Sequence, residues 1–293
     1  MPSSTPVARS ETPRLAFPAL LLANLVLPFG PVLVRLSDVG PVAAAFWRLS
    51  LALPFLLLLA WPGLKRTAPR RWEWGALILS GLFFAADLAA WHIGILCTKV
   101  TNAAIFGNMS ALLLPLWGIL VLRQRPAPMQ AAAFALATVG ALTMMGGSYE
   151  LSPRYLKGDL FCLLAGVLYT AYLLIVQRVR GRLDSWSVLA VSSVVSAPAL
   201  LLCALWLGET VMPGDWTPLI VLALSSQLVG QGMLTYAIGW FSPLVLGLSL
   251  LLQPAVAAVL GWMLFGEWLT PTDMLGTVAV SAALVLVRLP SRA

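Results

Sequence analysis

Long apolar stretches are the feature that most limits what this chain can fold into. They are about 20 residues long, and short segments rich in charged residues, proline and glycine separate them. About 20 helical residues are needed to cross the ~30 Å hydrocarbon core of a bilayer. Of the 293 residues, 60% are hydrophobic and only 10% are charged, and the mean hydropathy is +0.92. This composition excludes an ordinary soluble domain and predicts a membrane protein.

Ten such stretches can be placed, and we expect each to be a transmembrane helix. Only helices and closed barrels satisfy the backbone in lipid, and these stretches are too continuously apolar for barrel strands. We therefore predict an all-α membrane protein. The break near 240–242 depends mainly on Ser242-Pro243. The predicted spans are 15–37, 41–62, 72–96, 101–122, 128–146, 156–179, 186–208, 217–240, 242–265 and 271–289.

Lysine and arginine predict the orientation of the chain. If the N-terminus is cytoplasmic, thirteen basic residues fall in inside segments and only Lys99, Arg154 and Lys157 fall outside. The positive-inside rule then places both termini in the cytoplasm, in a multi-pass protein of the inner (plasma) membrane. Basic loops facing anionic lipid explain the formal charge of +7, so we expect no nucleic-acid partner. The first stretch is too long for a signal-peptide core and is expected to stay as the first span.

Residues that usually hold metals or cofactors are scarce. Cys97, Cys162 and Cys203 lie far apart and form no CxxC pair, so we interpret them as small apolar packing residues. A single histidine excludes a histidine-based metal cluster. We predict no metal and no cofactor. The chain also lacks a P-loop motif and does not hydrolyse ATP in that manner.

The ten spans divide into two halves of five. A shift of 143 residues lays the first half on the second, with Arg35 on Arg178 and Pro128 on Pro271. Because five is odd, the second half must enter the membrane in the opposite orientation. We predict ten transmembrane helices built as two inverted five-helix repeats around a central cavity. The predicted parts are a tail (1–14), the first repeat (15–146), a linker (147–155), the second repeat (156–289) and a tail (290–293).

Two segments resemble the EamA-type members of the drug/metabolite transporter (DMT) superfamily. The segment LLQPAVAAVLGWMLFGEWLTPTDMLGTVAVSAALVLV (251–287) has a proline in span 9, a Gly-Glu pair and a last span rich in small residues. The segment GILCTKVTNAAIFGNMSALLLPLWGILVLRQRP (94–126) is similar to spans 3 and 4 of the same family. Span number, topology and duplication extend the resemblance to the whole chain. Within the superfamily the chain resembles the YddG-type amino-acid exporters, although Gln124 stands where many members have glutamate.

The resemblance implies a secondary transporter whose central cavity is lined mainly by spans 1, 3, 4, 6, 8 and 9. We expect an exporter of small metabolites, with aromatic or small neutral amino acids as the leading substrates, that works by alternating access. The alternative within transporters is an efflux carrier for cationic or multiple drugs. A channel or non-transporting scaffold and an intramembrane enzyme are alternatives from other classes. Gly247-Leu248-Ser249-Leu250 lacks the final glycine of a rhomboid-like motif, so we predict that the chain is not an enzyme.

Two charged residues lie deep in predicted spans. Arg48 and Asp87 are about 10 and 13 Å below the outer ends of spans 2 and 3. Charges at such depths are costly and usually face a partner or a watery cavity. We predict an ion pair between them. Three alternative roles are open for these two residues. They form a structural bridge between helices, they contact the charged ends of a zwitterionic solute, or Asp87 takes part in proton coupling.

The neighbours of Asp87 suggest a binding site. Helical spacing places Phe83 at i−4, Phe84 at i−3 and Trp91 at i+4 on its face, and His92 lies one position further round. An acid among aromatic rings suits an amphipathic cation or an amino acid. Helix packing is the alternative for the rings, and a hydrogen-bonded packing role is the alternative for the histidine.

Neutral polar residues recur on two later spans. Gln227, Gln231 and Thr235 are spaced by four in span 8, and Ser249 and Gln253 repeat this spacing in span 9. They fit either the wall of a wet cavity or hydrogen bonds between helices. Further candidates for this wall are Asn24 in span 1, Tyr169 and Tyr172 in span 6, and Asn102 and Asn108 in span 4.

Proline and small residues predict how the bundle bends and packs. Pro28, Gly30 and Pro31 in the PFGP run form the densest break, and we predict a hinge in span 1, with a static kink as the alternative. Small residues spaced by four in spans 4, 5 and 10 allow close helix packing. We expect a monomer or a homodimer whose partners are a small-molecule solute and the lipid bilayer.

Overall fold

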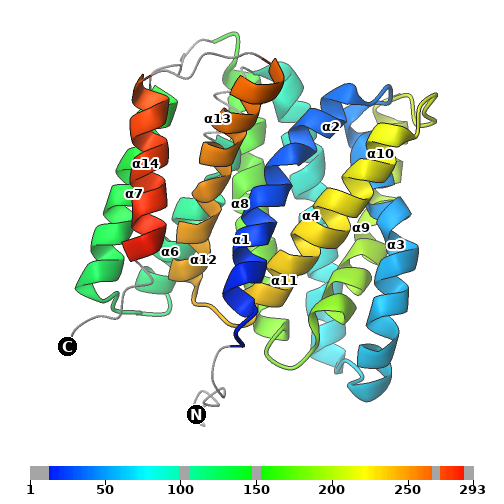
Figure 1. Cartoon of the computed structure of the whole chain (residues 1–293). Coiled ribbons are helices and arrows are strands. Elements are labelled where there is room, and N and C mark those ends of the chain that lie inside the picture. The colour runs from blue at the N-terminus through cyan, green and yellow to red at the C-terminus, as the bar shows by residue number, and fades with distance from the viewer. Residues whose placement is uncertain (1–12, 99–105, 147–152, 266–270, 287–293) are drawn as a thin grey trace.

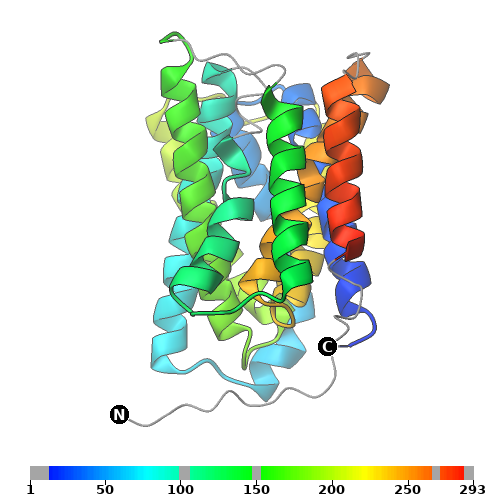
Figure 2. The same cartoon turned by 90° about the vertical axis from the view of Figure 1, so that its left-hand side faces the viewer.

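The computed structural model describes residues 13–98, 106–146, 153–265 and 271–286. In these ranges it consists of helices and their connections, without a strand. The helices lie side by side along one direction and form a single bundle (Figures 1 and 2). The all-α prediction is therefore confirmed. The predicted tails and most of the linker 147–155 lie outside the described residues.

The first half of the chain begins with a broken helix. Here α1 (Ala16–Val26), the 3-10 turn η1 (Leu27–Phe29) and α2 (Gly30–Leu36) follow one another without a loop. They are followed by α3 (Pro41–Arg66), α4 (Arg71–Cys97), α6 (Ser110–Leu120) and α7 (Pro128–Gly146).

The second half repeats this succession. It begins with α8 (Leu156–Val179) and α9 (Ser185–Trp206), which are followed by a composite helix. The chain then forms α12 (Pro243–Leu250), α13 (Leu252–Phe265) and α14 (Pro271–Leu286). The composite helix joins α10 (Thr217–Leu222), the π-helical η2 (Ala223–Gln231) and α11 (Gly232–Ile238). The predicted break before Pro243 is confirmed: Ser242 is the N-cap of α12, and its hydroxyl accepts the N–H of Val245 at 3.4 Å.

Six of the ten predicted spans are confirmed as helices long and apolar enough to cross a membrane. They are Ala16–Leu36, Pro41–Arg66, Arg71–Cys97, Leu156–Val179, Ser185–Trp206 and Thr217–Ile238, from a search of the described residues. The other four ranges also hold helices, namely α6, α7, α12 with α13, and α14. The total of ten crossings stays a prediction.

The predicted break in span 1 is present. The backbone tightens into a 3-10 turn at Pro28 and returns to α-helix at Gly30, with Pro31 in the first turn of α2. Proline lacks the N–H that would continue the α-helical ladder, which explains the change of helix type. A Cβ at Gly30 would lie 3.3 Å from the hydroxyl of Ser226, so the break also lets α2 approach η2 closely. Whether it hinges stays a prediction.

Equivalent helices of the two halves pack against each other. The 143-residue shift relates α3 to α9, α6 to α13 and α7 to α14, and close packing is found for α3 with α9 and for α7 with α14. Gly40, before α3, donates its N–H to Thr210, after α9, at 2.9 Å, and Ser187, at the start of α9, lies within 3.3 Å of the carbonyl of Ala60. The equivalent helices α3 and α9 are therefore antiparallel, as inverted repeats require.

The two ends of the bundle differ in charge. We call the end where α3 and α8 finish and α4 and α9 begin the arginine-rich end, because Arg66, Arg70, Arg180 and Arg182 lie in its connections. The start of α1 belongs to this end, since the ring of Phe17 packs against Phe241, and α14 finishes there too (Figure 1). The arginine-rich end is the one predicted to face the cytoplasm.

Candidate functional site

A cavity of about 230 Å³ lies between the helices of both halves. It extends from the middle of the bundle towards the end opposite the arginine-rich end, where the exposed Arg35 lines it. Spans 1, 3, 4, 6, 8 and 9 all contribute, and Arg48 adds span 2. The lining consists of Leu27, Pro28, Pro31, Val32, Arg35, Arg48, Phe84, Asp87, Leu88, Trp91, Ile95, Gly107, Asn108, Ser110, Tyr169, Gln231, Leu250, Gln253, Ala257 and Leu260.

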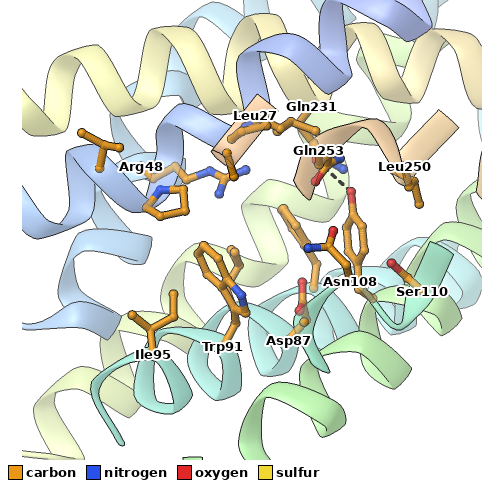
Figure 3. Close-up of a pocket in the computed structure, with 18 of the residues that line it drawn as sticks. Leu27, Arg48, Asp87, Trp91, Ile95, Asn108, Ser110, Gln231, Leu250 and Gln253 are labelled. Atoms are coloured by element: carbon orange, nitrogen blue, oxygen red, sulfur yellow. Dashed lines mark hydrogen bonds between the residues drawn. The ribbon is translucent and has the colours of Figure 1, made fainter. Parts of the chain in front are cut away.

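Asp87 and Arg48 face this cavity from different helices (Figure 3). Both side chains are largely buried, with 8% and 7% of their surface exposed. The predicted ion pair does not form, because the two groups are not within salt-bridge distance; the described residues contain one such pair, Glu73 with Arg182. The carboxylate of Asp87 has no hydrogen-bond partner among the described residues. The cavity therefore presents an anionic and a cationic group separately.

A short polar chain holds Arg48 in place. Its Nε donates to Oε1 of Gln227 at 3.2 Å, and Nε2 of Gln227 donates to the hydroxyl of Ser193 at 3.2 Å. Gln227 and Ser193 are fully buried, on η2 and α9. Gln227 thus lies behind the cavity wall and not in it, and it fixes the arginine through Nε.

Aromatic rings form the wall next to Asp87. Trp91 and Phe84 lie on α4 and Tyr169 lies on α8. A Cβ at Gly107 would lie 2.8 Å from Nε1 of Trp91, so the absence of a side chain there makes room for the indole. Phe84 stacks on Tyr172 with centroids 4.6 Å apart, and Tyr169 stacks on the same ring at 5.8 Å. Along α4 and α8 this stack lies at the part of the cavity nearest the arginine-rich end.

Of the two phenylalanines expected on the face of Asp87, Phe84 lines the cavity and Phe83 does not. Residues 84, 87, 88, 91 and 95 share the face of α4 that lines the cavity. Successive residues are rotated by about 100° around the helix axis. The other four lining residues therefore lie on one side of Asp87 around this axis, and Phe83 lies on the other side. Phe83 is half-buried and packs against the apolar core.

Two glutamines form the opposite wall. Oε1 of Gln231 accepts the hydroxyl of Tyr169 at 3.4 Å, and its Nε2 donates to the hydroxyl of Tyr172 at 3.2 Å. Nε2 of Gln253 donates to Oδ1 of Asn24 at 2.9 Å. Asn24 is fully buried and bonds the carbonyl of Leu20, so it supports Gln253 from behind.

The predicted stripe of Gln227, Gln231 and Thr235 does not form one wall. In the π-helical η2 four residues fall slightly short of a full turn, whereas in an α-helix they exceed it, so the directions of these side chains differ from an α-helical count. Gln231 lines the cavity, while Thr235 is buried away from it.

Two other predicted wall residues also lie away from the cavity. Ser249 is buried, and its hydroxyl donates to the carbonyl of Leu246 at 2.7 Å. His92 is buried, and its Nδ1 donates to the carbonyl of Pro41 at 2.5 Å, which agrees with the packing interpretation.

Three polar lining residues were not among the main predicted site residues. Asn108 was named only as a further candidate for the wall, and it faces the cavity beside Asp87 (Figure 3). Ser110 has no signal in the sequence. Arg35 could have been found, since a basic residue at the outer end of span 1 departs from the positive-inside pattern. The candidate Asn102 lies outside the described residues.

Known proteins resemble this chain in sequence. The EamA-like transporter family matches residues 15–146 and 156–289, so it accounts for most of the chain. The chain belongs to the EamA-like transporter family. Two uncharacterized transporters from Archaeoglobus fulgidus are similar to this transporter. One is 26% identical over 71% of this chain and 72% of its own, and the other is 23% identical over 92% and 94%.

The fold of this transporter is also found in solved structures. One crystal structure matches with a TM-score of 0.78 over 95% of this chain and 98% of its own, at 16% sequence identity. That likeness concerns the fold alone. Membership of a transporter family supports a transport function over an enzymatic one. Among the described residues, no group of three or more histidine, cysteine, aspartate or glutamate side chains could hold a metal ion, and Cys97, Cys162 and Cys203 are free thiols.

Proposed function

We propose that this transporter is a secondary carrier that exports small metabolites, with aromatic or small neutral amino acids as its substrates, by alternating access between its two repeats. The observation that carries the proposal is the separation of Asp87 and Arg48 in one cavity. A zwitterion can place its ammonium group at Asp87 and its carboxylate at the guanidinium of Arg48, whose Nε is already held by Gln227.

The cavity wall fits the rest of such a solute. Trp91, Phe84 and Tyr169 offer apolar and aromatic surface, and Gln231 and Gln253 offer neutral donors and acceptors. Ligand sites of this kind are mainly apolar with a few placed polar groups that set orientation. The cost of keeping an ionised carboxylate and a guanidinium at this depth also favours a role in binding.

The cavity lies on the side that we assign to the exterior. The stack of Phe84, Tyr172 and Tyr169 separates it from the arginine-rich end, which we place in the cytoplasm with both termini. We propose that exchange of the packing between the two inverted repeats opens the cavity to the arginine-rich end. An efflux carrier for cationic compounds would use Asp87 and the rings alone, and the presence of Arg48 in the same wall argues against it.

Counterflow in proteoliposomes tests the proposal. Vesicles are loaded with one unlabelled amino acid, and the entry of labelled tryptophan, phenylalanine, threonine or a cationic drug is followed. We expect saturable accumulation of an aromatic or small neutral amino acid. Accumulation of the drug alone would replace amino acids with cations as the substrate class. A folded, monodisperse protein that exchanges neither class would refute the proposed substrates.

A further inference from the structure

A second cavity, of about 330 Å³, lies at the arginine-rich end of the bundle. It forms where α3 ends, where α8 turns into α9, and where the chain leaves α11. Its lining includes Arg66, Arg180, Arg182, Asp184 and Trp240. None of these residues lines the central cavity. The proposed transport cycle gives this pocket no role.

The charge of the pocket is positive. Arg180 is 9% exposed, and its guanidinium donates to the carbonyls of Thr235 at 2.8 Å, Leu183 at 2.5 Å and Tyr236 at 3.2 Å. These three bonds to backbone carbonyls fix the side chain. Arg66 is exposed at the rim and has no ion-pair partner among the described residues. The pocket therefore holds one fixed and one adaptable guanidinium.

The remaining charges of the pocket are engaged locally. Arg182 pairs with Glu73, with Nε 2.7 Å from Oε1, and this hydrogen bond raises the pKa of Arg182. The carboxylate of Asp184 caps α9 by accepting the N–H of Ser187 at 3.0 Å. Three guanidinium groups are thus set against two carboxylates, Asp184 in the lining and Glu73 paired with Arg182, which leaves one positive charge in excess for an anion.

Exposed tryptophans place the pocket at the level of the lipid headgroups. Trp61 on α3 and Trp72 on α4 are 60% and 48% exposed near this end of the bundle. The ammonium of Lys65 lies 4.5 Å from the ring centre of Trp61, and the guanidinium of Arg178 lies 5.8 Å from that of Trp72. Tryptophan rings with basic neighbours are typical of the membrane–water interface.

We propose that this pocket binds the phosphate of an anionic phospholipid headgroup, with Arg66 and Arg180 as its ligands and Trp240 beside it. Basic pockets between transmembrane helices on the cytoplasmic side are suited to such headgroups. Guanidinium groups match the geometry of phosphate oxygens and bind them with charge-assisted hydrogen bonds. The bound lipid would bridge the ends of α3, α8 and α11, and this proposal does not depend on which solute is carried.

Native mass spectrometry of the detergent-solubilised full chain tests the site. Phosphatidylglycerol or phosphatidylcholine is titrated in, and the bound lipids are counted for the original protein, for Arg66→Gln and for Arg66→Glu. Arg125→Gln is the matched control, since Arg125 is exposed at the same end but does not line the pocket. We expect Arg66→Gln to weaken the tightest phosphatidylglycerol site about fivefold, which corresponds to one basic residue near a lipid surface. Arg66→Glu weakens it further, and the control leaves it unchanged.

Three results would overturn the proposal. Equal weakening by Arg66→Gln and Arg125→Gln would mean diffuse attraction between basic loops and lipid. Equal affinity for the two lipids would mean that the negative charge is not recognised. A third arm adds inorganic phosphate, and binding that depends on Arg66 for phosphate but not for phosphatidylglycerol would identify a soluble phosphate as the ligand. Arg66 is exposed and makes no hydrogen bond or ion pair among the described residues, so circular dichroism of each variant should match the original protein.

Discussion

At the residue scale, the central cavity depends on how two charges are held. Arg48 is fixed from behind through Nε, whereas Asp87 meets the cavity without a partner among the described residues. A direct ion pair between them would satisfy both charges and leave little for a solute to bind. Their separation keeps both groups available, at the cost of two incompletely compensated charges inside the membrane.

Replacing Asp87 by asparagine removes the anionic group and keeps the side-chain size. We expect Asp87→Asn to raise the KM for an amino acid about tenfold, because the ammonium loses a charge-assisted contact of about 1.5–3 kcal/mol. Initial rates of counterflow at varied solute concentration measure this. Trp91→Ala is expected to weaken transport as well, through lost ring contact. Unchanged kinetics in both variants, with folded protein, would place the binding site elsewhere.

Gln227 acts as a positioning residue for Arg48. Gln227→Met removes the acceptor of Arg48 Nε and leaves that donor buried, so we expect the KM to rise while the maximal rate changes less. Ser193→Ala is the matched control, since it removes only the far hydrogen bond of the same chain. A purely structural role would instead lower the unfolding temperature of both variants equally and leave the KM of the folded fraction unchanged.

At the element scale, α4 positions the cavity by packing closely on α8 and α9. A Cβ at Gly81 would lie 2.7 Å from the carbonyl of Ser192 and 2.7 Å from Cβ of Val195 on α9. At Gly94 it would lie 2.5 Å from Sγ of Cys162 on α8. These two glycines allow α4 to approach both neighbours, which brings Asp87 and Trp91 to the cavity wall.

A pair of glycine variants on α4 tests this packing. Gly81→Ala should destabilise the bundle by about 1–3 kcal/mol, because the new methyl group meets the backbone of α9. Gly75→Ala should be neutral or stabilising by up to about 1 kcal/mol, because nothing lies within 4 Å and alanine favours the helix. Thermal unfolding in detergent compares the two. Equal stability of both variants would show that α4 and α9 do not pack as described.

At the scale of the whole molecule, the bundle is closed at one end and hollow towards the other. Glu73 of α4 pairs with Arg182 of the turn between α8 and α9, and the aromatic stack lies between this end and the cavity. At the opposite end, Glu209 accepts the N–H groups of Val42 and Ala43 at 3.3 and 2.8 Å and thereby joins the loop after α9 to α3. For the cavity to open at the arginine-rich end, the ion pair of Glu73 with Arg182 and the aromatic stack around Tyr172 must both separate.

Cysteine labelling tests which side reaches the cavity. In a background without the three native cysteines, Ile95→Cys should react with a membrane-impermeant thiol reagent added outside, because Ile95 lines the cavity towards the outer end. Saturating solute should slow the reaction. Val176→Cys, at a position 1% exposed, is the control that should stay unlabelled. Labelling of Ile95→Cys only from the cytoplasmic side would reverse the proposed orientation.

The features that could be predicted from the sequence are those that depend on solvent and on local geometry. Apolar length predicts which segments cross the lipid, because the bilayer demands about 20 helical residues. The PFGP run and Ser242-Pro243 predict where helices break, because proline acts on its own turn. Similar reasoning at helical spacing placed Asp87 and Trp91 on one face of α4, and both line the cavity.

Which polar groups contact one another depends on the packing of helices that are distant in the sequence. Whether Arg48 bonds Asp87 or Gln227 depends on how α3, α4 and η2 are placed in space, and these helices come from distant parts of the chain. The π-helical geometry of η2 is likewise absent from any α-helical count of the sequence. Phe84 lines the cavity and Phe83 does not, because the neighbours of α4 determine which side of this face they cover. The spacing of residues in the sequence predicts which side chains share a face of a helix, whereas the packing of the helices determines which residues that face contacts.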